Sequence, residues 1–590
     1  MFRRILIAAL TVFLLAACSS AGNTAEGTNT NNPAPTSALP TPENAAPGAS
    51  GVGDPYFPGF GNSGYDVQHY LIDLEVDMDN NEIAGRTLIT ALATQDLDQM
   101  NLDFIGLSIA RVLVNGEEIS YQRQSRELIL NIPPIAEGQQ FEIEIAYSGV
   151  PGKGIDSSEL DAFELGWVYY GDGVYVAGEP SGSSTWYPVN EHPTDKALYT
   201  YEITVEEPYE VAANGSLQDV VAGDGENTFI WSSADPIASY LVTIAIAEFD
   251  IEEAIGPNGL LIRNYFGKDI ATFVRDDFDR QPEMIALFND LFGPYPFEAY
   301  GVVVHDVGLR FALETQTLSV FGRSFTTEDA VAHELAHSWF GDSVTLADWQ
   351  NIWLNEGFAS YASVLWFENT YGLDTSEDIL HDWYSAMAPG EPSYVLSRSE
   401  LAGAFQDLLP IGAQYSQNQA AEAAQTLLVN LVDQGELNGV IATLNEQVSA
   451  GDLASLLRGL SGNEFTMTNS RLAGAFSALA EDELAAEFAG AYPVPGDPSP
   501  DDVFSRSVYY RGALTLHALR LEIGDEAFFN TLRAYAERFQ KSNASTKDFI
   551  AVAEEISGQD LDALFEAWLF QPQIPDIPEL DLYYVDFVAQ

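Results

Sequence analysis

The first long stretch of patterned sequence alternates hydrophobic and polar positions with a period of two. Apolar residues alternate with acidic ones in Tyr70–Met78, and similar alternation returns in Phe141–Tyr147 and Tyr201–Val205. Successive side chains of a β-strand point to opposite faces, so this pattern predicts half-buried strands. Several such strands at short spacing, without helical periodicity between them, favour a β-sandwich or a large curved sheet over residues 56–250.

After residue 250 the period changes to that of amphipathic helices. It is clear in Ile270–Phe292 and in four stretches near the end of the chain: 509–523, 525–539, 546–556 and 561–570. Gly524 and Gly558 lie where two of these helices should stop. Two apolar runs, 301–305 and 311–320, predict strands of a small sheet beside the helices.

These patterns predict a multidomain α+β protein, because 590 residues are too many for one hydrophobic core. We expect an N-terminal β domain over residues 56–250 and a mainly α domain over 251–396 and 489–590. Residues 397–488, which are rich in Ala, Leu and Gln, would form a helical lobe inserted into the second domain.

The N-terminus has the pattern of an export signal. Two arginines precede an apolar run, Ile5–Leu15, that is too short to span a bilayer. The tetrapeptide Leu-Ala-Ala-Cys that ends at Cys18 resembles the bacterial lipoprotein cleavage box, in which the Cys is lipidated. Residues 1–18 would then be a lipoprotein signal peptide; the alternative is an ordinary cleaved secretory signal with an incidental Cys.

Residues 19–55 contain mostly Asn, Thr, Ala, Pro, Gly and Ser and no Lys or Arg, which is typical of a disordered tether. We therefore expect an exported protein, lipid-anchored to a bacterial cell membrane and facing outside the cytoplasm. Because Cys18 is the only cysteine, no thiol remains for catalysis or metal binding.

The charge balance excludes one class of partner. Lys and Arg number 24 and Asp and Glu 88, for a formal net charge of −64. The resulting negative field repels a phosphate backbone, so nucleic acid is not expected as a partner. Two interpretations of the acidity remain, attraction of cationic peptides and a solvated surface that keeps the protein soluble. The sequence leaves the oligomeric state open.

The central chemical motif is HELAH at residues 333–337. On a helix its two histidines lie at i and i+4 and project from one face, with Glu334 beside them to handle a proton of water. Thr326 with Asp329 would cap the start of this helix, and Gly341 follows its last turn. The pattern indicates a metal site on a helix.

A third ligand candidate, Glu356, comes after eighteen intervening residues and opens another amphipathic stretch. A hairpin of two helices would bring its carboxylate to His333 and His337. Two His and one Glu with an open fourth position suit a catalytic zinc ion, with Glu334 as general base. The alternative for Glu356 is a solvated carboxylate favoured by the helix dipole.

The stretch HELAHSWFGD, followed at this distance by NEGFASY, resembles the aminopeptidase N-like family of gluzincin zinc metallopeptidases. Other matching stretches are GYDVQHYLIDLEV, EPSGSSTWYPVNEHPTDKALY, ANGSL, ASYLVTIAIAEF and VYYRGALTLHALRLEIGDEAFF. The resemblance implies a saddle-like β domain followed by a thermolysin-like catalytic domain, one zinc ion, peptide substrates and exopeptidase action.

Three positions take their roles from this resemblance. Glu314, in FALET at the place of the family's GxMEN motif, matches the Glu that binds the substrate α-amine, and Glu179 matches a second amine-binding position. Tyr509, three residues before Gly512, matches the tyrosine that stabilises the oxyanion, although Tyr510 is adjacent. The alternatives are an edge-strand carboxylate, a surface-loop carboxylate and a core aromatic, respectively.

Two features depart from the family's pattern. The GxMEN equivalent replaces Gly, Met and Asn by Phe311, Leu313 and Thr315, so the side-chain preference does not carry over. The segment 397–488 is additional. It would either cap the cleft and limit substrates to short peptides, or decorate the outer surface.

The leading interpretation is a zinc aminopeptidase that hydrolyses N-terminal residues of peptides. An endopeptidase or carboxypeptidase on the same zinc site would instead cleave N-acetylated peptides. Epoxide hydrolysis, found in one branch of the family, has no lipid pocket in the sequence to support it. A catalytically silent peptide-binding lipoprotein would have no need of the general base Glu334.

Overall fold

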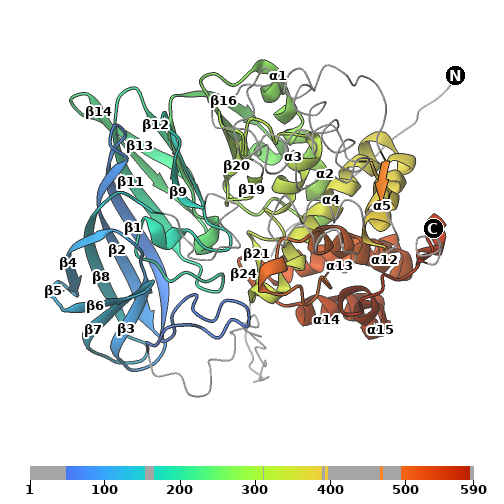
Figure 1. The fold of residues 1–590 in the computed structure, drawn as a ribbon, viewed down its shortest axis with the longest axis horizontal. Helices are drawn as coiled ribbons and strands as arrows, with labels where there is room; N and C mark the ends of the chain where they lie inside the picture. The colour runs from blue at the N-terminus through green and yellow to red at the C-terminus, as the bar shows by residue number, and fades with distance from the viewer. Residues whose placement is uncertain are drawn as a thin grey trace, which may run out of the picture. The chain divides into compact units, whose positions relative to one another are not determined.

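The computed structural model describes residues 48–152, 165–309, 311–388, 393–395, 466–468 and 493–584. The predicted signal peptide with Cys18, most of the predicted tether and all but Thr466–Thr468 of the predicted lobe at 397–488 lie outside these residues. None of the described helices is long and apolar enough to cross a membrane. Figure 1 shows a β-rich N-terminal region followed in the chain by a mainly helical one.

The last residues of the predicted tether belong to the folded protein. Asp54 is buried, accepts a hydrogen bond from the backbone N–H of Trp349 at 3.0 Å and lies 3.2 Å from Nε2 of His192. Burial alone would raise the pKa of Asp54, but the hydrogen bonds and the charge of His192 lower it. The stretch from Gly48 to Asp54 therefore belongs to the folded protein, and the predicted boundary at residue 55 is wrong.

The N-terminal region is built on an eight-stranded sheet with the order β13-β14-β11-β1-β2-β8-β4-β5 (Figure 1). In chain order its strands are β1 (Tyr65–Asp77), β2 (Glu82–Ala93), β4 (Ser108–Val114), β5 (Glu117–Glu118), β8 (Gln140–Gly149), β11 (Leu198–Glu206), β13 (Ser216–Ala222) and β14 (Glu226–Ser232). In β1, Tyr70, Ile72 and Leu74 are buried while Glu75 is exposed. The alternation of period two in Tyr70–Met78, Phe141–Tyr147 and Tyr201–Val205 therefore predicted β1, β8 and β11 correctly.

Two smaller sheets complete this region. One contains β3 (Leu97–Asp103), β6 (Tyr121–Gln124) and β7 (Glu127–Ile135). The other has the order β12-β15-β10-β9, with β9 (Gly166–Tyr169), β10 (Val174–Ala177), β12 (Glu210–Ala213) and β15 (Ile244–Ala247). Strand β10 is fully buried and leads directly to Glu179.

A five-stranded sheet begins the second region, with the order β16-β17-β18-β20-β19. Its strands are β16 (Phe249–Ile255), β17 (Leu261–Gly267), β18 (Ala299–His305), β19 (Ala312–Leu313) and β20 (Ser319–Gly322). The predicted strand at 301–305 is β18, and the predicted strand at 311–320 is divided between β19 and the start of β20. The short β19 forms an edge of the sheet and leads to Glu314.

The helices that carry and support the chemistry follow. They are α1 (Thr272–Arg275), α2 (Gln281–Phe292), α3 (Glu328–Ala336), α4 (Trp353–Tyr371), α5 (Leu373–Met387), α12 (Gly512–Ile523), α13 (Asp525–Arg538), α14 (Thr546–Ser557) and α15 (Asp562–Phe565). Gly524 and Gly558 end α12 and α14, as predicted. The predicted helix at 270–292 is instead two helices, because Pro282 lies in the first turn of α2, where its fixed φ favours a new start.

Short strands pair between segments that are distant in the chain. β21 (Val344–Leu346) pairs in parallel with β24 (Ser542–Ala544), and β22 (Ser393–Val395) pairs with β23 (Thr466–Thr468). The first pair joins the segment after α3 to the segment after α13, so the C-terminal helices are tied to the helix that carries HELAH.

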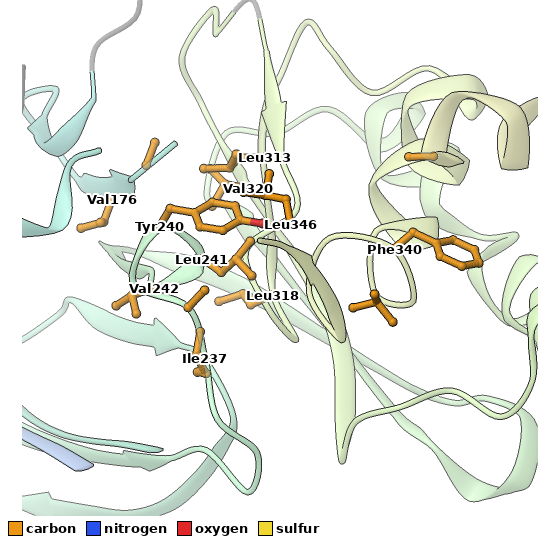
Figure 2. Packing of buried hydrophobic residues seen from close by; sticks show 14 of the residues in the cluster. Val176, Ile237, Tyr240, Leu241, Val242, Leu313, Leu318, Val320, Phe340 and Leu346 are labelled. Carbon is orange, nitrogen blue, oxygen red and sulfur yellow. The ribbon is translucent and has the colours of Figure 1, made fainter. Parts of the chain in front are cut away.

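The two regions share a continuous core (Figure 2). Tyr240, from the N-terminal region, is fully buried and drawn with Leu313 and Leu346 of the second region. Its hydroxyl donates to the backbone O of Gly341 at 3.3 Å and accepts from Nδ2 of Asn355 at 3.1 Å. This contact fixes the N-terminal region against the segments that follow α3 and begin α4.

Candidate functional site

Helix α3 places the HELAH motif along one side of a cavity. Thr327 is the N-cap, with its hydroxyl accepting from the backbone N–H of Ala330 at 3.3 Å. The predicted cap at Thr326 is wrong, because the Thr326 hydroxyl donates to Asp277 at 2.7 Å instead. His337 ends the helix.

The structure brings His333, His337 and Glu356 together. The Nε2 atoms of the two histidines are 3.0 Å apart, and Oε2 of Glu356 lies 3.1 Å from Nε2 of His333 and 3.5 Å from Nε2 of His337. Zn–N bonds of 2.0–2.1 Å in a tetrahedron put neighbouring ligand atoms about 3.4 Å apart. The donor set and its spacing therefore fit one zinc ion.

The turn after α3 orients His337. Its Nδ1 lies 3.0 Å from the backbone O of Phe340, which fixes the proton on Nδ1 and leaves Nε2 free to bind a metal. Gly341 has φ +136°, and a Cβ there would lie 2.9 Å from Nδ1 of His337. Glycine at this position thus allows both the turn and the close approach to the imidazole.

A contact between two glycines sets the distance between α4 and α12. A Cβ on Gly357 would lie 2.9 Å from backbone atoms of Gly512, so any side chain would push the helices apart. Gly357 directly follows Glu356, and Gly512 directly follows a π-helical turn at Ser507–Arg511. The close packing therefore holds Glu356 and the residues of this turn at fixed positions around the cavity.

The π-helical turn presents two tyrosines differently. The ring of Tyr509 stacks on that of His333 with centroids 5.9 Å apart and planes at 20°. The ring of Tyr510 stacks on Trp383 at 4.9 Å and 5°. Both tyrosines line the cavity. Of the two, Tyr509 is the one whose ring lies against His333, a metal-ligand candidate.

Two further carboxylates reach the cavity from separate elements. Glu314 follows the edge strand β19 and Glu179 follows β10; they are 3% and 9% exposed. Each has its Oε1 buried without a hydrogen-bond donor among the described residues. Oxygens of Glu179, Glu314 and Glu356 lie within 4.8 Å of one another, and Oε1 of Glu314 is 3.8 Å from Nδ1 of His337.

Burial and mutual repulsion shift the ionisation of these groups. Burial raises the pKa of Glu334 well above its usual value, and the charges of Glu314 and Glu356 add to the rise, while His337 opposes it. Burial and the Glu314 charge likewise raise the pKa of Glu179. For Glu356, burial would raise the pKa, but the charge of His337 and the hydrogen bonds with both histidines lower it to about 2. Positive charge bound here would relieve the repulsion.

The cavity has a volume of about 350 Å³. Besides the carboxylates, histidines and tyrosines described above, it is lined by Leu165, Phe311, Ala312, Leu313, Phe325, Thr327, Asp329, Ala330, Ser360, Ser363, Trp383 and Phe504. Neither Lys nor Arg is among the described lining residues. The cavity is thus lined by apolar and aromatic side chains together with five carboxylates.

Some contributors were not identified from the sequence. Nζ of Lys196 donates to the backbone O atoms of Asp342 at 2.9 Å and Ser343 at 3.1 Å, and so links the N-terminal region to the turn after His337. Asp329 lines the cavity one helical turn before His333. Helical periodicity could have indicated Asp329, whereas nothing local in the sequence marks the contact of Lys196.

Comparison with known families and proteins agrees with this geometry. The profile of the "Peptidase M1 N-terminal domain" matches residues 66–241, and that of the "Peptidase family M1 domain" matches residues 278–391 and 437–568. A curated relative, probable aminopeptidase 1 of Sulfurisphaera tokodaii, is 21% identical over 523 residues, which cover 85% of this chain and 53% of the relative. Aminopeptidase M1-A of Oryza sativa subsp. japonica is 24% identical over 67% of this chain and 37% of its own length.

The chain therefore spans about half or less of these curated relatives. A solved M1 zinc metallopeptidase from Deinococcus radiodurans matches 90% of this chain and 99% of its own, with a TM-score of 0.68 and 24% identity. That likeness is one of fold, over almost the whole of the solved structure.

Proposed function

We propose that this chain, which belongs to peptidase family M1, is a zinc aminopeptidase that releases the first residue of a peptide. One observation carries the proposal: Glu179 and Glu314 each bury a carboxylate oxygen without a donor, next to the group formed by His333, His337 and Glu356. These two oxygens lack a hydrogen-bond donor and a positive charge beside them. An α-ammonium group would supply both, because it has three N–H donors and a full positive charge.

The same pair would select a chain end over a mid-chain amide. A peptide bound further along its length would bring only a neutral amide to Glu179 and Glu314, and their charges would stay buried without compensation. Both carboxylates come from rigid surroundings, one after a buried strand and one after a sheet edge. The amine is thereby held at a fixed distance from the metal ligands, which sets the cleavage point after one residue.

A zinc ion held by the three ligands would supply Lewis acidity, which lowers the pKa of water towards neutrality. One oxygen of Glu334 lies within 4.8 Å of ligand atoms of His337 and Glu314. In this proposal Glu334 takes a proton from the attacking water and returns it to the leaving amine. The hydroxyl of Tyr509, beside His333, would stabilise the oxyanion that develops on the scissile carbonyl.

Similar proteins support the substrate class. The curated relatives described above are named as aminopeptidases, and a solved form of the Deinococcus radiodurans M1 zinc metallopeptidase is bound to a Tyr-Ser-Ala substrate. Peptides with a free α-amine are therefore the substrates that we propose for this chain.

The proposal is tested with aminoacyl anilides and their N-acetylated counterparts. Chelation should abolish cleavage of the free-amine anilides, and zinc should restore it. Glu314→Gln should lower kcat/KM by about a hundredfold, because one carboxylate of the amine site is lost, whereas Glu377→Gln, on an exposed face of α5, should not. Equal cleavage of the acetylated compounds would overturn the exopeptidase assignment.

Export and lipid anchoring at Cys18 are a separate proposal, supported by the cleavage box and the composition that follows it. Expressed in a bacterium fed a labelled fatty acid, the protein should carry the label and fractionate with membranes. Cys18→Ala should lose both properties; retention of the label in this variant would contradict lipidation at Cys18.

A further inference from the structure

Asp329 is a carboxylate of the cavity that has no role in the catalytic scheme above. It lies in the first turn of α3, is exposed, and receives no hydrogen bond or ion pair from any described residue. Its neighbour Glu328, by contrast, accepts from Nη1 of Arg280 at 2.7 Å and from Nε1 of Trp366 at 2.9 Å. Glu328 stabilises the packing of α3, while Asp329 faces the space that substrate would fill.

The described residues that line the cavity carry an excess of negative charge. The carboxylates that line the cavity are Glu179, Glu314, Asp329, Glu334 and Glu356, and no described lining residue is Lys or Arg. A divalent zinc ion would offset two of these five charges and the substrate ammonium a third. Negative charge is then left over, and Asp329, the exposed carboxylate of the five, presents it to the part of the substrate that lies beside it.

The geometry of α3 identifies that part. The amine site lies at the His337 end of the helix, since Glu314 is 3.8 Å from His337. Asp329 precedes His337 by about 12 Å along the axis, but it precedes the nearer metal-ligand candidate, His333, by only one turn, about 6 Å. An extended peptide advances about 3.3 Å per residue, so one or two residues after the scissile bond, which would lie at the metal ligands, bring the substrate beside Asp329.

The acidic surface continues in the same direction. Thr327 lines both the cavity and a second depression, in which Asp269 and Asp277 lie with the ion pair of Asp306 and Arg323. Nη1 of Arg323 is 2.6 Å from Oδ1 of Asp306, so its charge is already compensated. A longer substrate would therefore leave the cavity over a surface of net negative charge.

We propose that Asp329 determines specificity for the leaving peptide and favours substrates whose second or third residue is Lys or Arg. This inference rests on the aminopeptidase function proposed above. A cationic side chain there would pair with Asp329 at the cavity rim, whereas an acidic one would be repelled. Because the pair is exposed, its contribution is modest and depends on ionic strength.

The test uses tetrapeptides with one varied position, Ala-Xaa-Ala-Ala and Ala-Ala-Xaa-Ala, where Xaa is Lys, Gln or Glu. At low salt, wild-type kcat/KM for one or both Lys peptides should exceed that for the matched Gln peptide on the order of fivefold. The Glu peptides should be the poorest substrates, and salt should reduce all the differences. The ratio of Lys to Gln is the readout, because it is independent of the active fraction of each preparation.

Asp329→Asn should bring the Lys to Gln ratio close to one, and Asp329→Glu should restore the preference. Asp374→Asn is the matched control, since Asp374 is exposed and occupies the same position in the first turn of α5 but does not line the cavity. A wild-type ratio near one, or a preference unchanged in Asp329→Asn, would overturn the inference while leaving the aminopeptidase intact. Failure of the wild type to cleave any free-amine peptide would overturn both proposals.

Discussion

Two groups of buried carboxylates in this protein differ in whether their oxygens receive hydrogen bonds. In the N-terminal region, Asp103 and Glu191 flank Arg126. Asp103 accepts from Nε of Arg126 at 2.9 Å, from Asn62 at 3.2 Å and from the backbone N–H of Glu191 at 3.0 Å. Glu191 accepts from Arg126, from Ser181 and from two backbone N–H groups, so all four carboxylate oxygens have donors.

In the cavity the carboxylates outnumber their donors. Glu179 and Glu314 each keep a buried oxygen without a described donor, and burial, together with the charges of Glu314 and Glu356, raises the pKa of Glu334 well above its usual value. The first group is a finished structural network, and the second is arranged for ligands that bring positive charge. Both groups are buried, and they differ in the supply of donors: each oxygen of Asp103 and Glu191 has one, whereas Glu179 and Glu314 each keep one oxygen that has none among the described residues.

The two groups are also connected. The backbone N–H groups of Gly182 and Ser184, at 2.8 and 3.2 Å from Oε1 of Glu191, belong to the segment that directly follows Glu179. The satisfied network therefore holds the segment that carries one of the unsatisfied carboxylates, and rigidity in one group positions the other.

The largest effect on activity should come from replacing the proposed general base, Glu334. Glu334→Gln removes the group that accepts the proton from water, and kcat should fall about 10³- to 10⁴-fold. The melting temperature should not fall, because the substitution also removes a repelled buried charge. Steady-state kinetics with an anilide and a thermal melt check the two parts. Near-normal kcat would remove Glu334 from the mechanism.

Breaking the satisfied network should cost stability instead. Arg126→Met leaves Asp103 and Glu191 buried without their cation and should lower the free energy of unfolding by about 3–5 kcal/mol. Arg111→Met is the control, since Arg111 pairs with Glu144 at the surface and its loss should cost less than about 1 kcal/mol. Urea denaturation measures both; equal losses would show that the buried network has no special role.

Asp195 tests an intermediate case, because its carboxylate has hydrogen-bond donors but no ion pair with any described residue. It accepts from the backbone N–H of Val67 at 3.0 Å and from Asn190, yet burial and the charge of Asp66 raise its pKa to about 8. The folded state then holds a proton that the unfolded chain, with a pKa near 3.8, has lost. Stability should therefore fall as pH rises from about 4 to about 8.

In Asp195→Asn this part of the pH dependence should disappear. Urea denaturation of both proteins at pH 5 and pH 8 gives the comparison, and the loss of stability between the two pH values should be smaller in the variant. An identical loss in both would assign the pH dependence to other groups.

Local patterns predicted the local parts of this molecule. The alternation in Tyr70–Met78 and the i, i+4 spacing of His333 and His337 each depend on one element, and the structure has the corresponding strand and helix. The cap was placed one residue early, at Thr326 rather than Thr327, because adjacent threonines have the same preference and only the contact with Asp277 separates them.

Contacts between segments that are distant in the chain could not be predicted from local sequence patterns. Glu179 and Glu314 were identified through family resemblance, because neither strand end marks its carboxylate as facing a metal site. Lys196 reaches Asp342 across 146 positions of sequence, and no periodicity encodes such a pairing. The two helices at 272–292 were predicted as one because apolar spacing continued across the break that Pro282 introduces.

The central claim is that two buried glutamates, Glu179 and Glu314, bind the free α-amine of a peptide beside a zinc site. It is tested most directly by a mass-spectrometric time course on one octapeptide, offered with a free and with an acetylated N-terminus. The account predicts that the free peptide shortens one residue at a time from its N-terminus while the acetylated peptide stays intact. Internal cleavage, or equal loss of both peptides, would contradict it.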